Sequence, residues 1–302
     1  MESESPSYAA TTLAQAKSFC GTGNYDSAFV YFTRAAEEGE REAMTFLGIA
    51  YLSGEGTERD SVLGMHWLSQ AAKKKRDPRG MNALASVYEN DERMNGRYYW
   101  ARQWYTKAAE LGYAEAMRNL ARLYRKGLVI ERSDSAAIAR SDSVALEWYR
   151  RAVGAGSVDA LADIGWMYEE GLAGRRDENE AIRWYRQAAA AGSRLGMYAM
   201  GRVYQEAVGV PRDYQQARGW FLKSACAGSA SAMNELGVLY ERGLGGEADK
   251  DEAIAWFRRA AGAGSPDGAR NLARLNRDGV RKVIALLPRP GGHPAGCAAS
   301  HG

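Results

Sequence analysis

The sequence predicts an all-α fold in which antiparallel helix hairpins stack one on another. Two aromatic markers recur in phase every 36 or 37 residues, with one interval of 44, which indicates an internal repeat. Four of the seven prolines fall in the last 37 of 302 residues, so long stretches are free to be helical. The markers are Tyr51, Tyr88, Tyr124, Tyr168, Tyr204 and Tyr240, and Trp67, Trp104, Trp148, Trp184, Trp220 and Trp256.

The first helix of each unit carries the repeated tyrosine. A small residue precedes each tyrosine by three positions and therefore lies on the same helical face. Such residues allow two helices to approach closely, so we expect this face to contact the next helix. The small residues are Gly48, Ala85, Ala121, Gly165, Gly201 and Gly237.

The second helix has start and stop signals at fixed distances from its aromatic residue. N-cap residue types occur seven positions before it, at Asn24, Asp60, Ser141, Asp177, Asp213 and Asp249. A buried stripe is expected three positions before it, at Ala28, Ala101, Ala145, Ala181, Ala217 and Ala253. Eight positions after it come residues suited to a left-handed helix end: Gly39, Gly112, Gly156, Gly192, Gly228 and Gly264.

We interpret the repeated Tyr and Trp side chains as core and not as part of a cofactor site. A single hairpin cannot cover both of its apolar faces, so neighbouring hairpins must stack. On this interpretation, removing one buried Trp side chain costs about 3–5 kcal/mol.

The repeated pattern A-x-x-x-L-G-x-x-Y-x-x-G … D-x-x-x-A-x-x-W-x-x-x-A-A-x-x-G resembles the Sel-one-like repeat family, a relative of the tetratricopeptide repeat. The resemblance covers residues from about 8 to 280. It implies a right-handed superhelical α-solenoid that acts as a scaffold for protein–protein contacts and has no catalytic residues.

We expect one solenoid over residues 8–287, made of about seven hairpins and a C-terminal capping helix at "RKVIALLP". The first unit has Tyr31 in place of Trp, as an atypical terminal repeat can. Residues 1–7 and the Gly/Pro-rich residues 288–302 are expected to be disordered.

Three units depart from the pattern. The second has one extra residue and Lys75 where glycine belongs, and the third has Arg97 in place of the capping Asp. The fourth carries eight additional residues, which we place in a loop between its helices, within residues 129–142. The loop is either a tolerated surface insertion or a partner contact, since loops on rigid scaffolds often carry function.

A binding surface is predicted where first helices line the concave side, if the stacking follows tetratricopeptide geometry. Trp166 lies outside the repeated Trp register, so stacking does not explain it. Large aromatics and Arg anchor interfaces, and Arg forms charge-assisted hydrogen bonds to carboxylates. We therefore expect an acidic or C-terminal segment of a protein to bind there, the alternative being a solvated face. The candidate residues are Arg118, Arg122, Arg125, Trp166, Tyr198, Arg202 and Asn234.

Several function classes find little support. The catalytic and phosphate-loop motifs H-E-x-x-H, G-x-S-x-G and G-x-x-x-x-G-K-[ST] do not occur, so we expect no enzyme activity, cofactor or metal. A net charge of +3 argues against nucleic acid as the partner. The sequence contains no run of 18 apolar residues, so no membrane span is predicted. The odd set of three cysteines favours a reducing compartment.

These observations predict a non-enzymatic adaptor, monomeric and cytoplasmic, acting in signalling or regulation. The composition and the family resemblance favour a bacterial source. The alternative is a dedicated inhibitor, immunity protein or chaperone that clamps one enzyme. An RNA-binding helical repeat is less favoured, because acidic residues are interleaved with the arginines.

Overall fold

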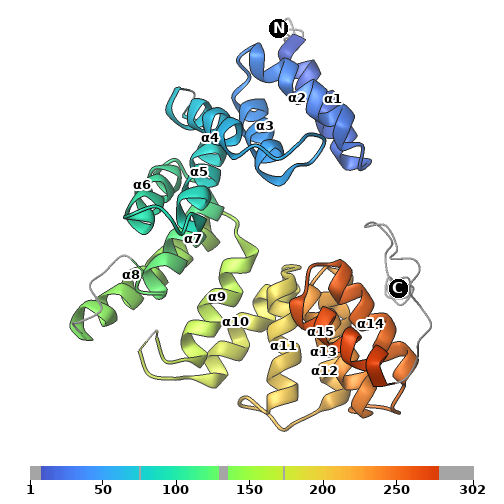
Figure 1. Cartoon of the computed structure of the whole chain (residues 1–302). Coiled ribbons are helices and arrows are strands. Elements are labelled where there is room, and N and C mark those ends of the chain that lie inside the picture. The colour runs from blue at the N-terminus through green and yellow to red at the C-terminus, as the bar shows by residue number, and fades with distance from the viewer. Residues whose placement is uncertain (1–7, 75, 129–134, 173, 279–302) are drawn as a thin grey trace, which may run out of the picture. The chain divides into compact units, whose positions relative to one another are not determined.

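The computed structural model describes residues 8–74, 76–128, 135–172 and 174–278. Over these ranges the chain forms fifteen α-helices and one π-helix, with no strand, which confirms the predicted all-α class (Figure 1). Contacts divide the chain into two compact units, Met1–Gly156 and Ser157–Gly302, and each is described by itself. The single solenoid over residues 8–287 stays a prediction. Residues 1–7, the segment "RKVIALLP" and residues 288–302 lie outside the described residues.

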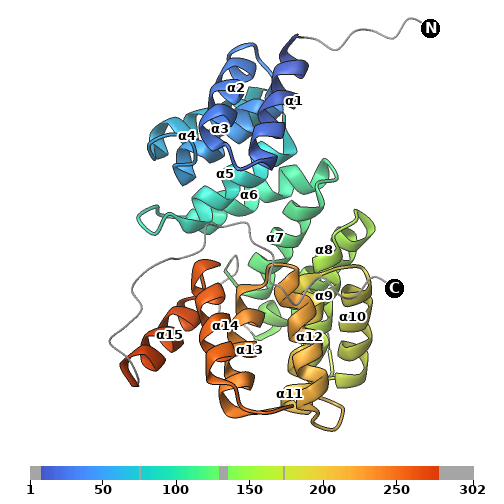
Figure 2. The same cartoon turned by 90° about the vertical axis from the view of Figure 1, so that its right-hand side faces the viewer.

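The first unit contains four hairpins, in which successive helices pack against each other (Figures 1 and 2). Its helices are α1 (Tyr8–Gly21), α2 (Tyr25–Glu37), α3 (Arg41–Ser53), α4 (Ser61–Ser69), η1 (Gln70–Lys74), α5 (Pro78–Asn90), α6 (Arg97–Glu110), α7 (Ala114–Arg125) and α8 (Ser135–Gly154).

The second unit contains three hairpins and one further helix. Its helices are α9 (Val158–Glu169), α10 (Glu178–Ala190), α11 (Arg194–Glu206), α12 (Tyr214–Cys226), α13 (Ala230–Arg242), α14 (Lys250–Gly262) and α15 (Pro266–Asp278). In both units the odd-numbered helix of a hairpin is its first helix and the even-numbered helix is its second.

The predicted helix ends are confirmed for most second helices. The side chains of Asn24, Asp60, Asp177, Asp213 and Asp249 each accept a backbone N–H of the following turn. The N–H of each of the four aspartates donates to the carbonyl of the repeated Tyr on the preceding helix, at 2.8 to 3.0 Å. The glycines predicted to stop these helices have φ between 84° and 95°, where a side chain would be strained.

The prediction for Ser141 is wrong, because this residue lies inside α8 and does not cap it. Part of the insertion is helical, so α8 begins at Ser135 and runs for 20 residues. The Ser141 hydroxyl donates to the carbonyl of Tyr124 at 2.6 Å. It thus reaches the same tyrosine carbonyl that an aspartate N–H reaches in the other hairpins.

The centre of each hairpin is the residue that follows the repeated Trp, a position that the sequence analysis missed. Leu68, Tyr105, Tyr149, Tyr185, Phe221 and Phe257 are each 2% exposed or less. Of the repeated aromatics, only Trp104 and Trp256 are buried, and the others are partly buried. Several of the partly buried ones, Tyr51, Trp67, Tyr168, Tyr204, Trp220 and Tyr240, pack against the buried core, so the repeated aromatics contribute to the core without forming its centre.

The small residues on the first helices allow the close approach that was predicted. A Cβ atom added to Gly201 would lie 2.5 Å from the ring of Phe221, and one added to Gly237 would lie 2.5 Å from the ring of Phe257. The extra residue of the second hairpin is accommodated by the π-helix η1, whose wider turn takes up one additional residue.

Candidate functional site

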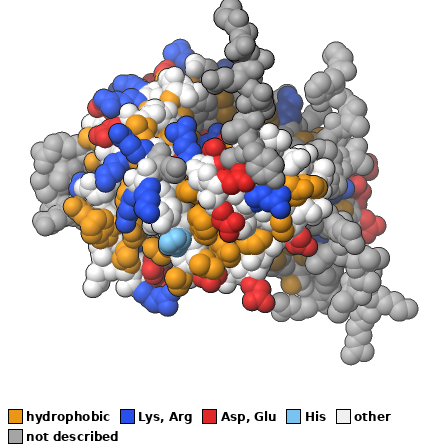
Figure 3. Space-filling view, turned by 90° about the horizontal axis from the view of Figure 1, so that it is seen from above, with side chains coloured by type: hydrophobic (Ala, Val, Ile, Leu, Met, Phe, Trp, Pro, Cys, Tyr) orange, Lys and Arg blue, Asp and Glu red, His pale blue; other side chains and the backbone are white. Residues whose placement is uncertain are grey.

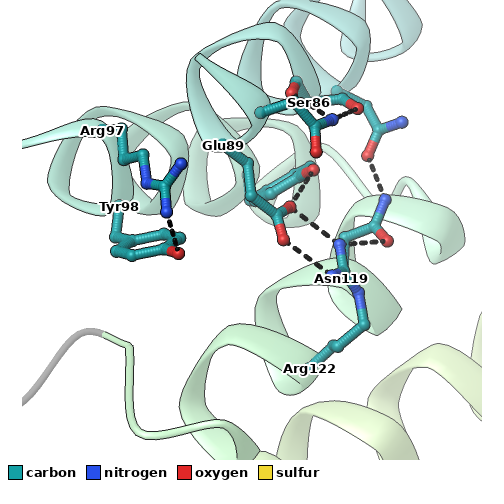
Figure 4. Close-up of polar contacts among 9 residues, drawn as sticks. Ser86, Glu89, Arg97, Tyr98, Asn119 and Arg122 are labelled. Carbon is teal, nitrogen blue, oxygen red and sulfur yellow. Dashed lines mark hydrogen bonds and ion pairs between the residues drawn. The ribbon is translucent and has the colours of Figure 1, made fainter. Parts of the chain in front are cut away.

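Across the first helices of successive hairpins, a glutamate pairs with an arginine of the next hairpin. In the first unit, the Arg122 guanidinium on α7 donates to both carboxylate oxygens of Glu89 on α5, each at 2.7 Å (Figure 4). The buried Tyr105 hydroxyl of α6 donates to the same carboxylate at 3.0 Å. Three helices therefore meet at one carboxylate that is 9% exposed.

The second unit repeats this arrangement. On α9, Glu169 accepts from the hydroxyl of Tyr185 on α10 at 2.5 Å and from Arg202 on α11 at 3.1 Å. Arg202 also bonds Glu206 of its own helix, at 2.8 and 3.1 Å. A third pair joins α13 to α15, where Arg274 donates to both oxygens of Glu241, at 2.6 and 2.7 Å. Bidentate pairs of this kind fix orientation as well as distance.

Asparagine pairs accompany two of these ion pairs. Asn119 on α7 donates to Asn82 on α5 at 3.0 Å, and Asn271 on α15 donates to Asn234 on α13 at 2.9 Å. At the intervening α11–α13 interface Gln205 takes the position of the glutamate, and it donates to Glu235 at 3.1 Å. The first helices are thus joined by specific polar contacts in each unit.

The surroundings of these pairs shift the pKa of several of the groups in them. Burial, the hydrogen bond to Glu169 and the charge of that carboxylate raise the pKa of Tyr185 far above its ordinary value. Burial lowers the pKa of Arg122, but the hydrogen bond and charge of Glu89 outweigh this and leave it raised. The hydrogen bond from Arg274 holds the pKa of Glu241 below its ordinary value. The hydrogen bond to the arginine therefore favours the charged form of Glu241.

The three predicted arginines of α7 lie in the first unit. Arg122 is engaged with Glu89, so its guanidinium joins two hairpins. Arg118 has a side chain only 21% exposed and lies 3.7 Å from Glu115. The charge of Arg125 acts on Asp142 of the insertion, where burial raises the pKa of the carboxyl and Arg125 partly offsets that rise. Part of the insertion therefore has a structural role beside α7.

The other four predicted residues lie in the second unit, on three first helices. Trp166 is partly buried and packs at the edge of the apolar core of α10 and α11. Tyr198 is also partly buried, with its ring 5.5 Å from that of Phe221, and burial raises its pKa. Asn234 is only 8% exposed within the α13–α15 interface, and Arg202 is held by two glutamates.

The sequence analysis missed the glutamates, although a signal for them exists. Glu89, Glu169 and Glu241 each follow a repeated Tyr by one position, and their arginines lie 33 residues further on. Aligning the units with one another would have shown opposite charges recurring together at these two positions.

Other kinds of site find no support in the part of the chain that the structure describes. Over these residues, no group of three or more His, Cys, Asp or Glu side chains could hold a metal ion. None of the described helices is long and apolar enough to cross a membrane. The face drawn in Figure 3 mixes basic, acidic and apolar side chains, without the continuous basic field that nucleic acid favours.

Comparison with known families agrees with the repeat. Seven consecutive segments match the model of the Sel1 repeat: residues 13–40, 41–75, 78–113, 114–157, 158–193, 194–229 and 230–265. The chain belongs to the Sel1 repeat family. The predicted resemblance is thereby confirmed, and Sel1 repeats generally mediate protein–protein interaction.

Solved structures confirm the solenoid class of the Sel1 repeats. A Sel1 repeat protein from Oxalobacter formigenes is 26% identical with a TM-score of 0.63, over 82% of this chain and 96% of that one. The protein c5321 of uropathogenic Escherichia coli, a protective antigen with this fold, is 29% identical with a TM-score of 0.55, over 90% of this chain and 57% of that one.

A curated relative is far longer than this chain. Chitin synthase regulatory factor 3 of Schizosaccharomyces pombe is 35% identical over 103 residues, which is 32% of this chain. The match spans 11% of the length of that protein. The match supports membership of the repeat family. It covers too little of the relative to transfer that protein's activity to this chain.

Proposed function

We propose that this Sel1 repeat chain is a non-enzymatic scaffold that binds a protein partner on its first-helix face, defined as the surface formed by α9, α11 and α13 of the second unit. The observation that carries the proposal is the presence of Trp166 and Tyr198 on that surface, both partly exposed. The repeat requires no aromatic residue at either position, since the other units carry different residue types there. Partly exposed aromatics on a rigid surface are typical interface anchors.

The ion pairs change the role that we assign to the arginines. Because Arg202 is already bonded to Glu169 and Glu206, an acidic partner would have to compete with two carboxylates. We therefore assign Arg122 and Arg202 to holding adjacent first helices in register. In this proposal the side chains of Trp166 and Tyr198 anchor the partner. Asn234 does not contact the partner but joins α13 to α15 through its hydrogen bond with Asn271.

Affinity capture with the purified full-length chain tests the proposal. We expect the proteins recovered by the wild type to be lost with the double variant Trp166→Ala/Tyr198→Ala. The control is Arg183→Ala on α10, whose side chain is 72% exposed on a second helix, and this variant should recover them. Equal recovery by the double variant and the wild type would contradict the proposal.

The composition of the captured material separates the alternatives. One enzyme held tightly at equal stoichiometry would favour the dedicated inhibitor, whereas several weakly bound proteins would favour a regulatory adaptor. A cytoplasmic location stays a prediction.

A further inference from the structure

The N-cap of α6 departs from those of α2, α4, α10, α12 and α14, where an Asn or Asp side chain accepts a backbone N–H. Its N-cap position is Gly96, with φ of 72° and no side-chain hydrogen bond to the first turn, and its first turn contains no acidic residue. Arg97 follows directly, although a positive charge near a helix N-terminus is unfavourable. Residues that weaken a helix end without improving its packing are typical of functional positions.

The same turn exposes two large aromatic side chains, Tyr99 at 52% and Trp100 at 47%. The second helix of the preceding hairpin exposes Val62 at 77% and Leu63 at 40%, at the same two register positions. Other hairpins mostly carry polar residues there, namely Asp26 and Ser27, Ser143 and Val144, Asn179 and Glu180, Gln215 and Gln216, and Asp251 and Glu252. We call Val62, Leu63, Tyr99 and Trp100 the aromatic edge.

The rings of the aromatic edge are held in place by their neighbours. The ring centroids of Tyr99 and Trp100 lie 5.2 Å apart in an edge-on contact, and the ring of Tyr88 lies 6.4 Å from that of Trp100. Arg97 stacks 4.6 Å from the ring of Tyr98 and donates to its hydroxyl at 2.8 Å (Figure 4). Ordered aromatics lose little conformational entropy when a partner binds.

A hollow of about 730 Å³ lies between the start of α4 and the loop that leads into α6. Leu52, Met65 and Val87 give it an apolar lining, and Arg59 and Arg93 lie among its polar residues. Two acids, Asp91 and Glu92, also line it. Asp91 and Arg93 are engaged with each other, because the Asp91 carboxylate accepts the backbone N–H of Arg93 at 3.1 Å and lies 3.8 Å from its guanidinium.

The two arginines and the two acids of the hollow balance each other in charge. On α6 arginine is the dominant charge, because Arg97 and Arg102 flank the aromatic edge and the first acid is Glu110 at the far end of the helix. Arg102 also lies 5.8 Å from the ring of Tyr99. A partner that complements both features would present large apolar side chains next to carboxylates.

We propose that the aromatic edge and the adjoining hollow form a second docking surface, which binds a segment of a protein partner with large apolar residues beside acidic ones. The apolar residues would enter the hollow and cover Tyr99 and Trp100, and the acidic residues would meet Arg97 and Arg102. This surface lies in the first unit, on α4 and α6 and on the neighbouring ends of α3 and α5. It shares no residue with the first-helix face, so either proposal can fail without the other.

The test begins with phage-displayed random peptides selected on the purified full-length chain. Selected peptides are labelled, and their affinities are measured by fluorescence anisotropy for the wild type, Tyr99→Ser/Trp100→Ser and Arg97→Glu/Arg102→Glu. We expect peptides that combine acidic and large apolar residues, and a loss of affinity of about tenfold or more in both double variants. The control Trp166→Ala/Tyr198→Ala should bind these peptides as the wild type does.

The proposal would be overturned by a selection that yields no peptide sensitive to the two double variants, by enrichment of basic peptides, or by binding to vesicles of anionic lipid without binding to any peptide. Loss of affinity confined to the Trp166→Ala/Tyr198→Ala variant would also overturn it, while supporting the scaffold proposal. Leu63→Ser serves as a further variant of the edge, and circular dichroism of each variant establishes that its helices are intact.

Discussion

At the scale of single residues, two neighbours on the same helix have different roles. Trp220 is partly buried, and Lys223 lies 4.4 Å from its ring, whereas the adjacent Phe221 is fully buried against Gly201. The larger side chain is the more obvious marker in the sequence, yet the smaller one fills the hairpin. The contribution of a residue therefore follows from its burial and not from its size.

This difference predicts unequal costs of truncation. Phe221→Ala should lower the free energy of unfolding by about 3–5 kcal/mol, because it leaves a cavity between α11 and α12. Trp220→Ala should cost clearly less, although it removes more atoms. Urea unfolding monitored by circular dichroism compares the two variants, and an equal or larger loss for Trp220→Ala would contradict the assignment of the core.

The ion pairs predict a pH effect at Glu241. Its pKa is lowered in the folded chain by the hydrogen bond from Arg274. A carboxylate with a lowered folded pKa stabilises the fold above its ordinary value, and that contribution is lost as the pH falls through the folded pKa.

Arg274→Gln should therefore raise the pKa of Glu241. It should also reduce stability at neutral pH, by an amount that shrinks as the solution becomes acidic. A carboxylate titration followed by NMR measures the shift directly, with Arg270→Gln on the same helix as the control. An unchanged pKa of Glu241 would show that the pair has no electrostatic effect.

Residue patterns allowed part of the site to be predicted. Trp166 was found because it breaks the register of the repeated tryptophans. The engagement of Arg122 and Arg202 was missed, because their partners come from another hairpin and each glutamate looks like an ordinary surface acid in isolation. Which charges pair depends on the spacing between helices, and a single unit of the repeat does not contain that information.

At the scale of elements, caps and stops were predictable because their physics is local. An aspartate before a helix and a glycine after it act within one turn of chain. Ser141 was assigned wrongly because the insertion extends α8 towards its N-terminus, so Ser141 lies inside the helix. Its side chain still reaches Tyr124, so the contact between the helices persists with a different donor.

Close helix approach predicts opposite effects for two glycines of one hairpin. Gly201→Ala would place a methyl group 2.5 Å from the ring of Phe221, and we expect a loss of about 1–3 kcal/mol. Gly219→Ala in the interior of α12 meets no atom within 4 Å, so it should stabilise the chain by about 0.5–1 kcal/mol. Thermal or urea unfolding distinguishes the two, and the same sign for both would contradict the packing described above.

At the scale of the whole molecule, the repeat has two consequences for function. The recurring core and polar pairs are used for stacking, so they say little about a partner. Side chains that depart from the recurring pattern, such as Trp166 on α9 and Trp100 on α6, are not required for stacking. Both docking proposals are therefore based on residues of this kind.

The most direct test of the scaffold proposal is hydrogen–deuterium exchange of the full-length chain with and without a captured partner. The account predicts slower amide exchange in α9, α11 and α13, around Trp166 and Tyr198, and unchanged exchange in α10, α12 and α14. Protection confined to those second helices, or no protection of the first helices, would contradict the claim that the partner binds the first-helix face.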